Sequence, residues 1–290
     1  DLHLSIRRQR QMCIRDRKYM VPEGHTIHRL SKDLTKDLDG RRVIATSPQG
    51  RFENGASKIN GKAFNGSEAW GKHLFLMFSG NAILHIHLGL IGKFRPVSID
   101  SLPTDTVRLR LEGKSAWQLT GPQKCSLISS DEYSLVIDAL GPDPLRRSSR
   151  VADFEASLKK RKTPIAISLL DQSVIAGVGN VYRAEFLFML GIHPNRPSCD
   201  LTSAEVREIW ELATQQLRQG VRLNRIVTVT EQDSGKKPGH LRRSKALYVY
   251  KRETLPCRRC GSPIRIAEFA GRSCWSVSYT HLTLPTNREV

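Results

Sequence analysis

Residues 169–182 read Leu-Leu-Asp-Gln-Ser-Val-Ile-Ala-Gly-Val-Gly-Asn-Val-Tyr, and this stretch decides the interpretation of the chain. It joins two segments of helical periodicity, so we predict a glycine-rich turn between two helices. Gly177 and Gly179 allow a close backbone approach, and the start of the second helix favours a phosphate. The simpler alternative is a turn between helices that Asn180 caps. A nucleotide-binding glycine loop is disfavoured, because no strand precedes the turn and no Gly-Lys-Ser/Thr sequence follows it.

The periodicity on either side of this turn changes along the chain. Apolar residues three and four positions apart predict helices in the second half. These segments are 154–158, 164–170, 181–190 and 204–217. Near the start, the spacing of Ile27, Leu30, Leu34 and Leu38 predicts an amphipathic helix that begins just after residues 22–24. From residue 42 to about 138, short apolar runs separated by Gly, Pro, Asn and Asp predict short β-strands.

These changes divide the chain into parts. We predict a β domain, a linker, a helical domain and a basic loop that leads into a small cysteine-containing module. Their ranges are 21–140, 141–152, 153–230 and 231–275. The two ends, 1–20 and 276–290, match their neighbours in neither composition nor periodicity, so we expect both to be foreign to the protein. The ordinary alternative is a disordered basic arm and a polar tail.

The chain is strongly basic. Its 46 Lys and Arg against 28 Asp and Glu give a net charge of +18, of which residues 1–20 contribute +4, so +14 remains in the body. This balance indicates a polyanionic partner, nucleic acid first. The 39% hydrophobic content argues against a disordered chain. With neither a long apolar run nor a secretory signal, we expect a cytoplasmic protein. Six cysteines are too few for a disulfide scaffold, and Cys257-x-x-Cys260 suggests metal binding.

Four motifs occur in a characteristic order. They are Pro-Glu-Gly-His-Thr at 22–26, Trp-Gly-Lys-His-Leu-Phe at 70–75, the stretch at 169–182, and Cys-Arg-Arg-Cys-Gly at 257–261 with Ala-Gly-Arg at 270–272. The chain between Pro22 and Arg272 thereby resembles the bacterial formamidopyrimidine-DNA glycosylase/endonuclease VIII family, most closely its actinobacterial endonuclease VIII-like branch. The resemblance implies a monomeric α+β multidomain protein. Its parts would be an N-terminal β-sandwich with the nucleophile helix, a helix-two-turn-helix domain and a truncated zinc-finger hairpin, with DNA in a basic cleft between the domains.

The resemblance also implies catalytic roles. Pro22 would be the nucleophile, Glu23 the general acid/base and Lys72 a catalytic group at a β-turn. Only an N-terminal proline has a free secondary amine, so the active chain would start at Pro22 after removal of an initiator residue at Val21. Without the other motifs, Pro22 and Glu23 would be ordinary residues of a helix start, and Lys72 a solvated turn residue.

DNA-binding roles follow from the same resemblance. Asn180 would bind the phosphate next to the lesion, Arg272 would clamp the phosphates that flank it, and Gly177 and Gly179 would shape the turn. The residues Leu90 and Ile91 would fill the gap that a flipped base leaves. The alternative for this last pair is that both are core residues at a strand end.

The cysteine module resembles the first half of the family's zinc finger. A structural Zn²⁺ site needs four ligands, and Cys257 and Cys260 supply two. The second pair is expected close to Val277, where the sequence has no cysteine. Cys274 stands three positions too early and His281 has no matching partner. We therefore expect an incomplete zinc site.

Three functions fit these residues. The leading one is a DNA base-excision repair enzyme, a bifunctional glycosylase and abasic-site lyase that acts on duplex DNA with damaged bases or abasic sites. Pro-Glu-Gly rather than Pro-Glu-Leu favours oxidised pyrimidines as substrates. A non-catalytic binder of damaged DNA is the alternative, because Pro22 is not the first residue of the sequence. A zinc-ribbon nucleic-acid adaptor explains the charge and the cysteines but not the other motifs.

Overall fold

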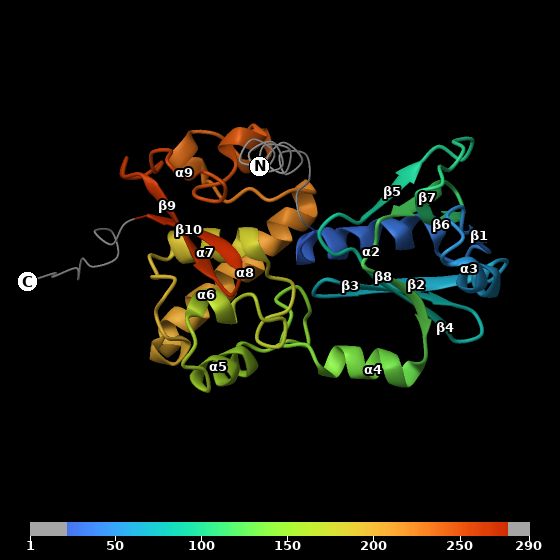
Figure 1. Ribbon diagram of the computed structural model, residues 1–290, viewed down its shortest axis with the longest axis horizontal. Coiled ribbons are helices and arrows are strands. Elements are labelled where there is room, and N and C mark those ends of the chain that lie inside the picture. The colour runs from blue at the N-terminus through green and yellow to red at the C-terminus, as the bar shows by residue number, and fades with distance from the viewer. Residues whose placement is uncertain (1–21, 278–290) are drawn as a thin grey trace, which may run out of the picture. The chain divides into compact units, whose positions relative to one another are not determined.

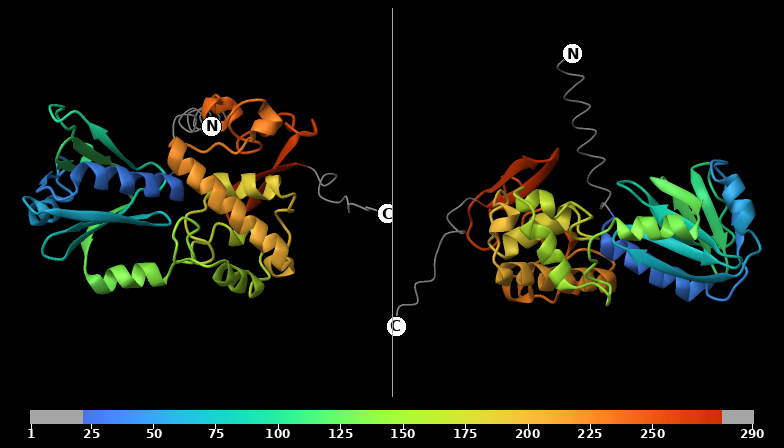
Figure 2. Two further views of the ribbon diagram at one scale, coloured as in Figure 1. Left: turned by 180° about the vertical axis from the view of Figure 1, so that it is seen from behind. Right: turned by 90° about the horizontal axis from the view of Figure 1, so that it is seen from below.

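The computed structural model describes residues 22–277 (Figures 1 and 2). The described chain forms two compact units. The first, here called the sandwich unit, comprises Pro22, residues 31–68 and residues 73–130. The second, the helical unit, comprises residues 23–30, 69–72 and 131 onwards. The expected α+β architecture, with an N-terminal β-sandwich, a helical domain and a C-terminal β-hairpin, is confirmed.

The sandwich unit contains two four-stranded sheets. One has the order β1-β6-β7-β5, with bounds Ile44–Thr46, Val107–Glu112, Ala116–Thr120 and Lys93–Val97. The other has the order β2-β3-β4-β8, with bounds Phe64–Trp70, His73–Phe78, Ala82–His87 and Lys124–Ile128. Gly80 and Asn81 join β3 to β4 with φ angles of +71° and +57°. Glycine and asparagine tolerate this left-handed conformation best, so the local sequence favours the hairpin.

The first helix, α2 (Gly24–Leu38), contacts strands of both sheets. The predicted amphipathic helix is confirmed, because Ile27, Leu34 and Leu38 are almost fully buried. In the sandwich unit, its Ser31 hydroxyl donates to the Ser67 carbonyl of β2 at 3.1 Å. Its Asp37 carboxylate accepts hydrogen bonds from side chains next to and within β7. The helix is therefore fixed by polar contacts as well as by its apolar face.

Two helices lie within the region that the sequence predicts to be a β-rich domain of short strands. α3 (Glu53–Ile59) interrupts the strands and α4 (Ser130–Asp138) follows the last of them, and neither helix was identified from the sequence. α4 has no buried residue, and such a helix carries no apolar stripe for periodicity to detect. α3 has seven residues, which is about two turns and too short for a periodic pattern.

The helical unit contains four helices at the segments predicted from periodicity. They are α5 (Val151–Lys159), α6 (Ile165–Ser168), α7 (Asn180–Met189) and α8 (Ser203–Leu223). Their apolar faces form one core. α8 begins with a capping box, in which the Thr202 side chain accepts from the Glu205 N–H and Glu205 accepts from the Thr202 N–H. It ends at Asn224, whose φ of +52° stops the helix.

The C-terminal part of the helical unit contains a short helix and a hairpin. α9 spans Glu231–Ser234, and β9 (Ile264–Phe269) pairs antiparallel with β10 (Arg272–Val277). The fully buried Glu185 of α7 connects this part to the helices. Its carboxylate accepts the backbone N–H groups of Tyr248, Val249 and Tyr250, each at 2.8 Å, and the hydroxyl of Thr228. One carboxylate thus satisfies four donors, of which those of Thr228, Tyr248 and Val249 are buried and that of Tyr250 is partly buried.

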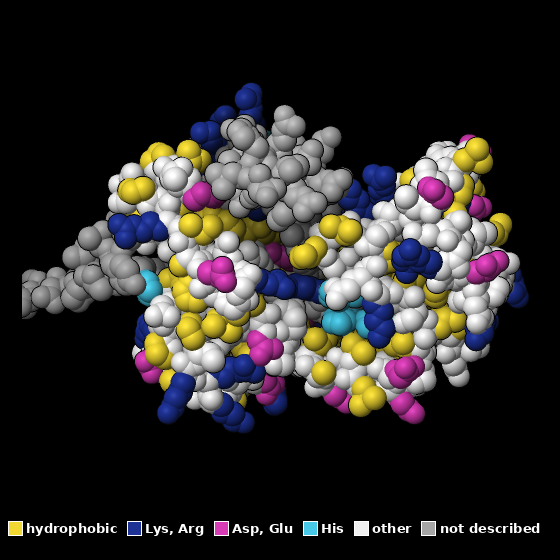
Figure 3. Space-filling view, viewed as in Figure 1, with side chains coloured by type: hydrophobic (Ala, Val, Ile, Leu, Met, Phe, Trp, Pro, Cys, Tyr) yellow, Lys and Arg dark blue, Asp and Glu magenta, His cyan; other side chains and the backbone are white. Residues whose placement is uncertain are grey.

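Basic side chains lie on the surface of both units (Figure 3). This distribution agrees with the excess of Lys and Arg in the sequence. Among the described helices, none combines the length and the apolarity that a bilayer crossing requires.

Two buried histidines make the stability of the protein sensitive to acid. Burial lowers the pKa of His25 to about 3, helped by the charge of His28, and it lowers the pKa of His85 to about 3, helped by His73, Lys124 and His87. An unfolded histidine titrates near 6.5, so between pH 6.5 and 3 the unfolded state binds protons that the folded state does not. Each histidine therefore reduces stability on acidification by about 1.4 kcal/mol per pH unit at most.

We expect the change His85→Gln to make this loss smaller. The free energy of unfolding, measured with urea at pH 7.5 and pH 4.5, should fall less in the variant than in the unchanged chain, because one of the two protonation sites is gone. If the free energy of unfolding fell by the same amount between pH 7.5 and pH 4.5 in both proteins, His85 would not be a source of the acid sensitivity.

Candidate active site

Glu23 occupies the centre of the candidate active site. It lies between Pro22 and the first residue of α2, and its side chain is fully buried. Its carboxylate accepts the backbone N–H of Gly179 at 2.9 Å, of Val181 at 2.8 Å and of Tyr182 at 3.4 Å. Val181 and Tyr182 lie in the first turn of α7, and Gly179 is the residue before the helix. Glycine has no side chain that could cap the helix.

Glu23 therefore caps a helix that lies more than 150 residues further along the chain. The first N–H groups of a helix have no partners within the helix, and its N-terminus favours negative charge. The alternative interpretation of Glu23, as an ordinary acidic residue at a helix start, is partly correct. The helix start that its carboxylate binds is that of α7, however, and not that of α2. The glycine-rich turn of residues 176–180 thereby has a second function, because it brings these donors to the acid.

The glycines of this site allow its backbones to approach closely. The Gly24 N–H donates to the Gly177 carbonyl at 2.8 Å. A Cβ atom on Gly24 would lie 2.8 Å from the Cα of Gly177, and one on Gly179 would lie 2.5 Å from the carboxyl carbon of Glu23. Side chains at Gly24 and Gly179 would therefore displace the turn or Glu23.

Glu23 and Lys72 influence each other electrostatically. Burial raises the pKa of the Glu23 carboxyl, while the charge of Lys72 and the three N–H groups oppose the rise. Burial also lowers the pKa of the Lys72 ammonium, as does the charge of Arg272, while Glu23 opposes the fall. Both shifts favour the neutral forms, so proton transfer at this site is expected nearer to neutral pH than for exposed groups.

A buried aspartate fixes the turn that carries Lys72. Asp143 is 1% exposed, and its carboxylate accepts the N–H of Gly71 at 2.7 Å and binds Nε2 of His28 at 2.8 Å. Gly71 has a φ of +55°, a conformation that suits glycine. Sequence analysis placed Asp143 in a linker and missed this role. Its partners lie 72 and 115 residues away, a separation that no local pattern reveals.

Asn180 and Arg272 are brought together in the helical unit. Asn180 is the first residue of α7, and its Nδ2 donates to the carbonyl of Ser273, the residue after Arg272, at 3.1 Å. Arg272 starts β10 and is exposed. A third residue, the buried Arg183, also contacts Asn180 and Ser273 and was not identified from the sequence.

Leu90 and Ile91 lie in the sandwich unit, in the turn between β4 and β5. They are 61% and 69% exposed. This excludes the alternative that they are core residues. Two adjacent exposed aliphatic side chains are available for a wedge, but that role stays a prediction.

The cysteines do not complete a metal site within residues 22–277. Cys257 and Cys260 lie before β9, and the Cys257 sulfur accepts the N–H of Arg259 at 3.4 Å. Among the described residues, no three His, Cys, Asp or Glu side chains lie close enough together to hold a metal ion. Cys274 is buried in β10 opposite Ala267, and His281 lies outside the described residues. The thiols present therefore fit only half of a zinc site.

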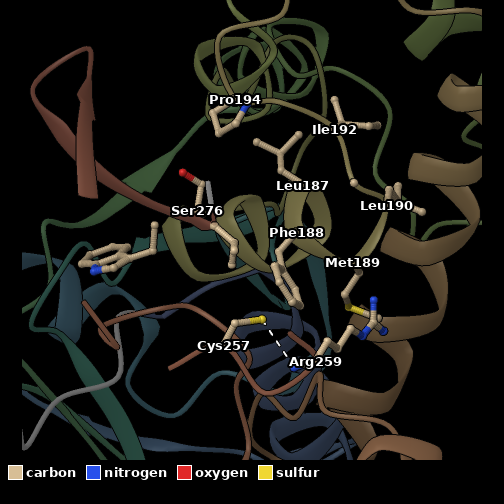
Figure 4. A pocket seen from close by; sticks show the side chains of 12 residues that line it. Leu187, Phe188, Met189, Leu190, Ile192, Pro194, Cys257, Arg259 and Ser276 are labelled. Atoms are coloured by element: carbon tan, nitrogen blue, oxygen red, sulfur yellow. Dashed lines mark hydrogen bonds between the residues drawn. The ribbon is translucent and has the colours of Figure 1, made fainter. Parts of the chain in front are cut away.

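A cavity of about 310 Å³ adjoins Cys257 (Figure 4). Its lining is mostly apolar and comes from the end of α7, the loop after it and the hairpin: residues 187–192, Pro194, Cys257, Arg259 and residues 275–277. None of the candidate catalytic residues lines it, so it is not part of the site around Glu23.

We expect the change Gly179→Ala to reduce activity strongly. The backbone of Gly179 has a φ of −127°, which alanine also adopts, so the change tests the contact with Glu23 rather than backbone strain. Displacement of the carboxylate should reduce turnover of a lesion-containing duplex by at least about tenfold, because a general acid needs close positioning.

The control for this change is Gly239→Ala. A Cβ atom there would meet the nearest neighbouring atom at 3.6 Å, an ordinary contact. Activity assays and thermal unfolding of both variants separate the local effect from general destabilisation. Equal activity of the two variants would show that the Gly179–Glu23 contact does not matter.

Comparison with known proteins agrees with this geometry. The sequence model described as the formamidopyrimidine-DNA glycosylase N-terminal domain matches residues 21–128, and that of the H2TH domain matches residues 140–232. The chain is 39% identical over 261 residues to "Endonuclease 8 1" of Mycobacterium tuberculosis, covering 87% of this chain and 97% of that protein. It is 30% identical over 264 residues to the "Formamidopyrimidine-DNA glycosylase" of Syntrophotalea carbinolica, covering 88% and 96%.

Solved structures show the same fold. A structure described as a complex between Lactococcus lactis Fpg and DNA with an abasic site is similar with a TM-score of 0.72, at 23% identity, over 88% of this chain and 97% of that one. The two domain matches cover more than half of the chain, and the relatives are matched over almost their full length. The chain therefore belongs to the formamidopyrimidine-DNA glycosylase/endonuclease VIII family of base-excision DNA-repair glycosylases.

Proposed function

We propose that the protein is a bifunctional DNA glycosylase and abasic-site lyase that removes oxidised bases, with pyrimidines favoured. The observation that carries the proposal is the buried Glu23 carboxylate, which follows Pro22 directly and interacts electrostatically with Lys72. An acid beside an amine in a low-dielectric site is the combination that Schiff-base chemistry needs. Membership of the glycosylase family supports the same reaction.

The proposed reaction begins at the Pro22 amine. Its lone pair attacks C1′ of the damaged nucleotide, the C1′–N bond breaks, and the bonding pair leaves with the base. Glu23 provides a proton to the sugar ring oxygen, the ring opens and an iminium forms between proline and C1′. Loss of a C2′ proton expels the 3′ phosphate, and a second elimination expels the 5′ phosphate. Water then hydrolyses the imine and frees the amine.

The remaining site residues would hold the DNA. Asn180 and Arg272 are proposed to bind the phosphates at the lesion, and Lys72 a phosphate or sugar oxygen that gains charge. Gly177 and Gly179 would let the turn approach the sugar-phosphate backbone of the DNA. The exposed Leu90 and Ile91 would fill the gap left by the flipped base. The Cys-x-x-Cys spacing of Cys257 and Cys260 suggests a structural Zn²⁺ site. It would need ligands that residues 22–277 do not provide, so no step of the reaction is assigned to the metal.

The proposed partner is duplex DNA with damaged bases or abasic sites. The matched solved structures hold such DNA, and the relatives are bacterial proteins. We accordingly propose a monomer that acts in the bacterial cytoplasm, where it associates with the nucleoid through DNA. The proposed functional domains keep the sequence-based boundaries, 21–140, 153–230 and 231–275, with a linker at 141–152.

The test is trapping with borohydride, which reduces the iminium to a stable amine. Two forms are compared, one that starts at Pro22 with a free amine and one with all 290 residues. Each is mixed with a duplex that carries one abasic site or one oxidised pyrimidine. We expect a covalent protein–DNA adduct from the Pro22 form alone. Adducts from both forms would assign the nucleophile to a lysine instead, with Lys72 the first candidate.

A non-catalytic binder of damaged DNA is the second candidate. The observation in its favour is that residues 1–21 precede Pro22 in the sequence, so that its nitrogen is an amide. Lesion binding by both forms without an adduct from either would support this function and exclude the lyase.

A further inference from the structure

Arg183 of α7 is fully buried, although its guanidinium is always charged. In the part of the chain that the structure describes, no carboxylate lies within 4.0 Å of it; its hydrogen bonds go to the carbonyls of Ala166 and Ser273 and to the side chain of Asn180. Its Nε atom has no hydrogen-bond partner among the described residues. The Glu23 carboxylate acts on this charge only from beyond that distance, so the cost of burying the charge is only partly offset, and the arginine reduces the stability of the free protein.

Arg183 determines how the amide of Asn180 is oriented. A guanidinium is only a donor, so the atom that faces Arg183 must be Oδ1. The Nδ2 atom then points the other way and donates to the Ser273 carbonyl at 3.1 Å. An amide nitrogen has two hydrogens, and the second remains available for an incoming acceptor. The reversed amide would turn its NH₂ group toward the guanidinium and its oxygen toward the Ser273 carbonyl, so Arg183 and Ser273 together hold the orientation that suits a phosphate.

The same guanidinium holds the strand that carries Arg272. The Ser273 carbonyl of β10 accepts from Arg183 at 2.8 Å as well as from Asn180. Arg272 is near enough that its charge lowers the pKa of both Arg183 and Lys72. The charge of Arg272 thus acts on two further cations, Arg183 and Lys72, and the carboxylate whose charge acts on both of these is Glu23. Such an arrangement has an excess of positive charge and gains stability when an anion binds.

We propose that Arg183 is a positioning residue for a DNA phosphate: it orients the donor side of Asn180 and fixes the start of β10, so that both bind one phosphodiester at the lesion. This inference rests on the proposed function, because it assumes that Asn180 and Arg272 bind phosphate. The phosphate then supplies an anion in addition to Glu23, and it acts on Arg183 across Asn180 rather than by direct contact.

The test is a double-mutant cycle between Arg183 and Asn180. Lysine keeps the charge of Arg183 but not its planar fork, so it cannot bind Asn180, Ala166 and Ser273 together. Binding of the full chain is measured on a duplex with one tetrahydrofuran abasic-site analogue and on the undamaged duplex. We expect Arg183→Lys to weaken binding of the analogue duplex by about tenfold, as for one charge-assisted hydrogen bond, and binding of the undamaged duplex by less than about twofold.

The cycle distinguishes positioning from a merely structural role. In a chain that already carries Asn180→Ala, the change Arg183→Lys should weaken analogue binding by no more than about threefold. The matched control is Arg110→Lys in β6. That arginine is 4% exposed, and its fork binds the carbonyls of Ile99 and Ser101 in the sandwich unit, whereas Asn180 and Arg272 belong to the helical unit. It should leave the preference for the analogue unchanged.

Other outcomes would overturn the proposal in distinguishable ways. Additive effects of the two changes would show that Arg183 does not act through Asn180, and equal losses on both duplexes would show that it only supports the fold; either result overturns the proposal. If Asn180→Ala has no effect on analogue binding, the phosphate role of Asn180 fails, and the proposal for Arg183 fails with it. Thermal unfolding verifies that each variant is folded; should Arg183→Lys unfold, Arg183→Gln replaces it in the same cycle under the same criteria.

Discussion

Replacement of Glu23 by glutamine is expected to reduce excision and strand cleavage by about 10²–10⁴-fold in the form that starts at Pro22, the range that general acid–base catalysis contributes. Glutamine keeps the shape of the side chain but cannot release a proton. Its NH₂ group would also face one of the N–H donors of Gly179 and Val181, which now bind the two carboxylate oxygens. The measurements are single-turnover excision rates and the yield of borohydride-trapped adduct.

Two further measurements separate chemistry from capping in this variant. Loss of one hydrogen bond to α7 should lower the free energy of unfolding by about 1–3 kcal/mol, while binding of a tetrahydrofuran duplex should change little. A rate near that of the unchanged chain would show that Glu23 is only a helix cap. The pH profile gives an independent check. Glu23 must be protonated to act as the acid, and burial raises its pKa, so kcat/KM should decline with rising pH at a pH higher than the 4.5 of an ordinary carboxyl, and this decline should be absent from the glutamine variant.

Replacement of Glu185 by leucine should have the largest effect on stability, about 4 kcal/mol. Three backbone N–H groups and one hydroxyl now bind its carboxylate, and all would lose their acceptor, three of them in a buried position. Each unsatisfied buried donor costs about 1–3 kcal/mol. The effect should be strongest locally, so amide hydrogen exchange at Tyr248, Val249 and Tyr250 should accelerate more than exchange in α8.

The matched control is Glu253→Gln. The Glu253 carboxylate accepts one hydrogen bond, from Trp275 Nε1 at 2.7 Å, and the residue is exposed. Its replacement should cost no more than about 1 kcal/mol, since solvent can replace the bond. Urea unfolding of both variants measures the difference. A loss for Glu185→Leu no larger than that of the control would contradict its role as the connection between α7 and the C-terminal part.

The sequence predicted those parts of the fold that carry a strong local signal. α2 was located because Ile27, Leu34 and Leu38 repeat with a helical period and are buried. The turn before α7 was located because its glycines and asparagine form a dense local pattern. α4 was missed because it has no buried face, so its position depends on tertiary contacts that periodicity does not detect.

The site was predicted only where a short motif marks it. Glu23, Lys72 and Asn180 each lie within a recognisable stretch of a few residues. Asp143 and Arg183 lie in the same site, but their partners are up to 115 residues away. Nothing in the residues around a buried polar side chain identifies a distant partner. The exposure of Leu90 and Ile91 likewise had to come from the structure, because a wedge and a core strand end have the same apolar sequence.

The hydrogen bond between Glu23 and the Gly179 N–H spans 156 residues, and this separation orders events during synthesis. A ribosome that adds about 5–20 residues per second makes Gly179 roughly 10–30 s after Glu23. Contacts so distant in sequence are among the last to form during folding. The Glu23 carboxylate therefore becomes buried against α7 only after most of the chain has been translated. Under the proposed function the Pro22 amine has to be released, and this interval is the time in which release would precede burial of the neighbouring carboxylate.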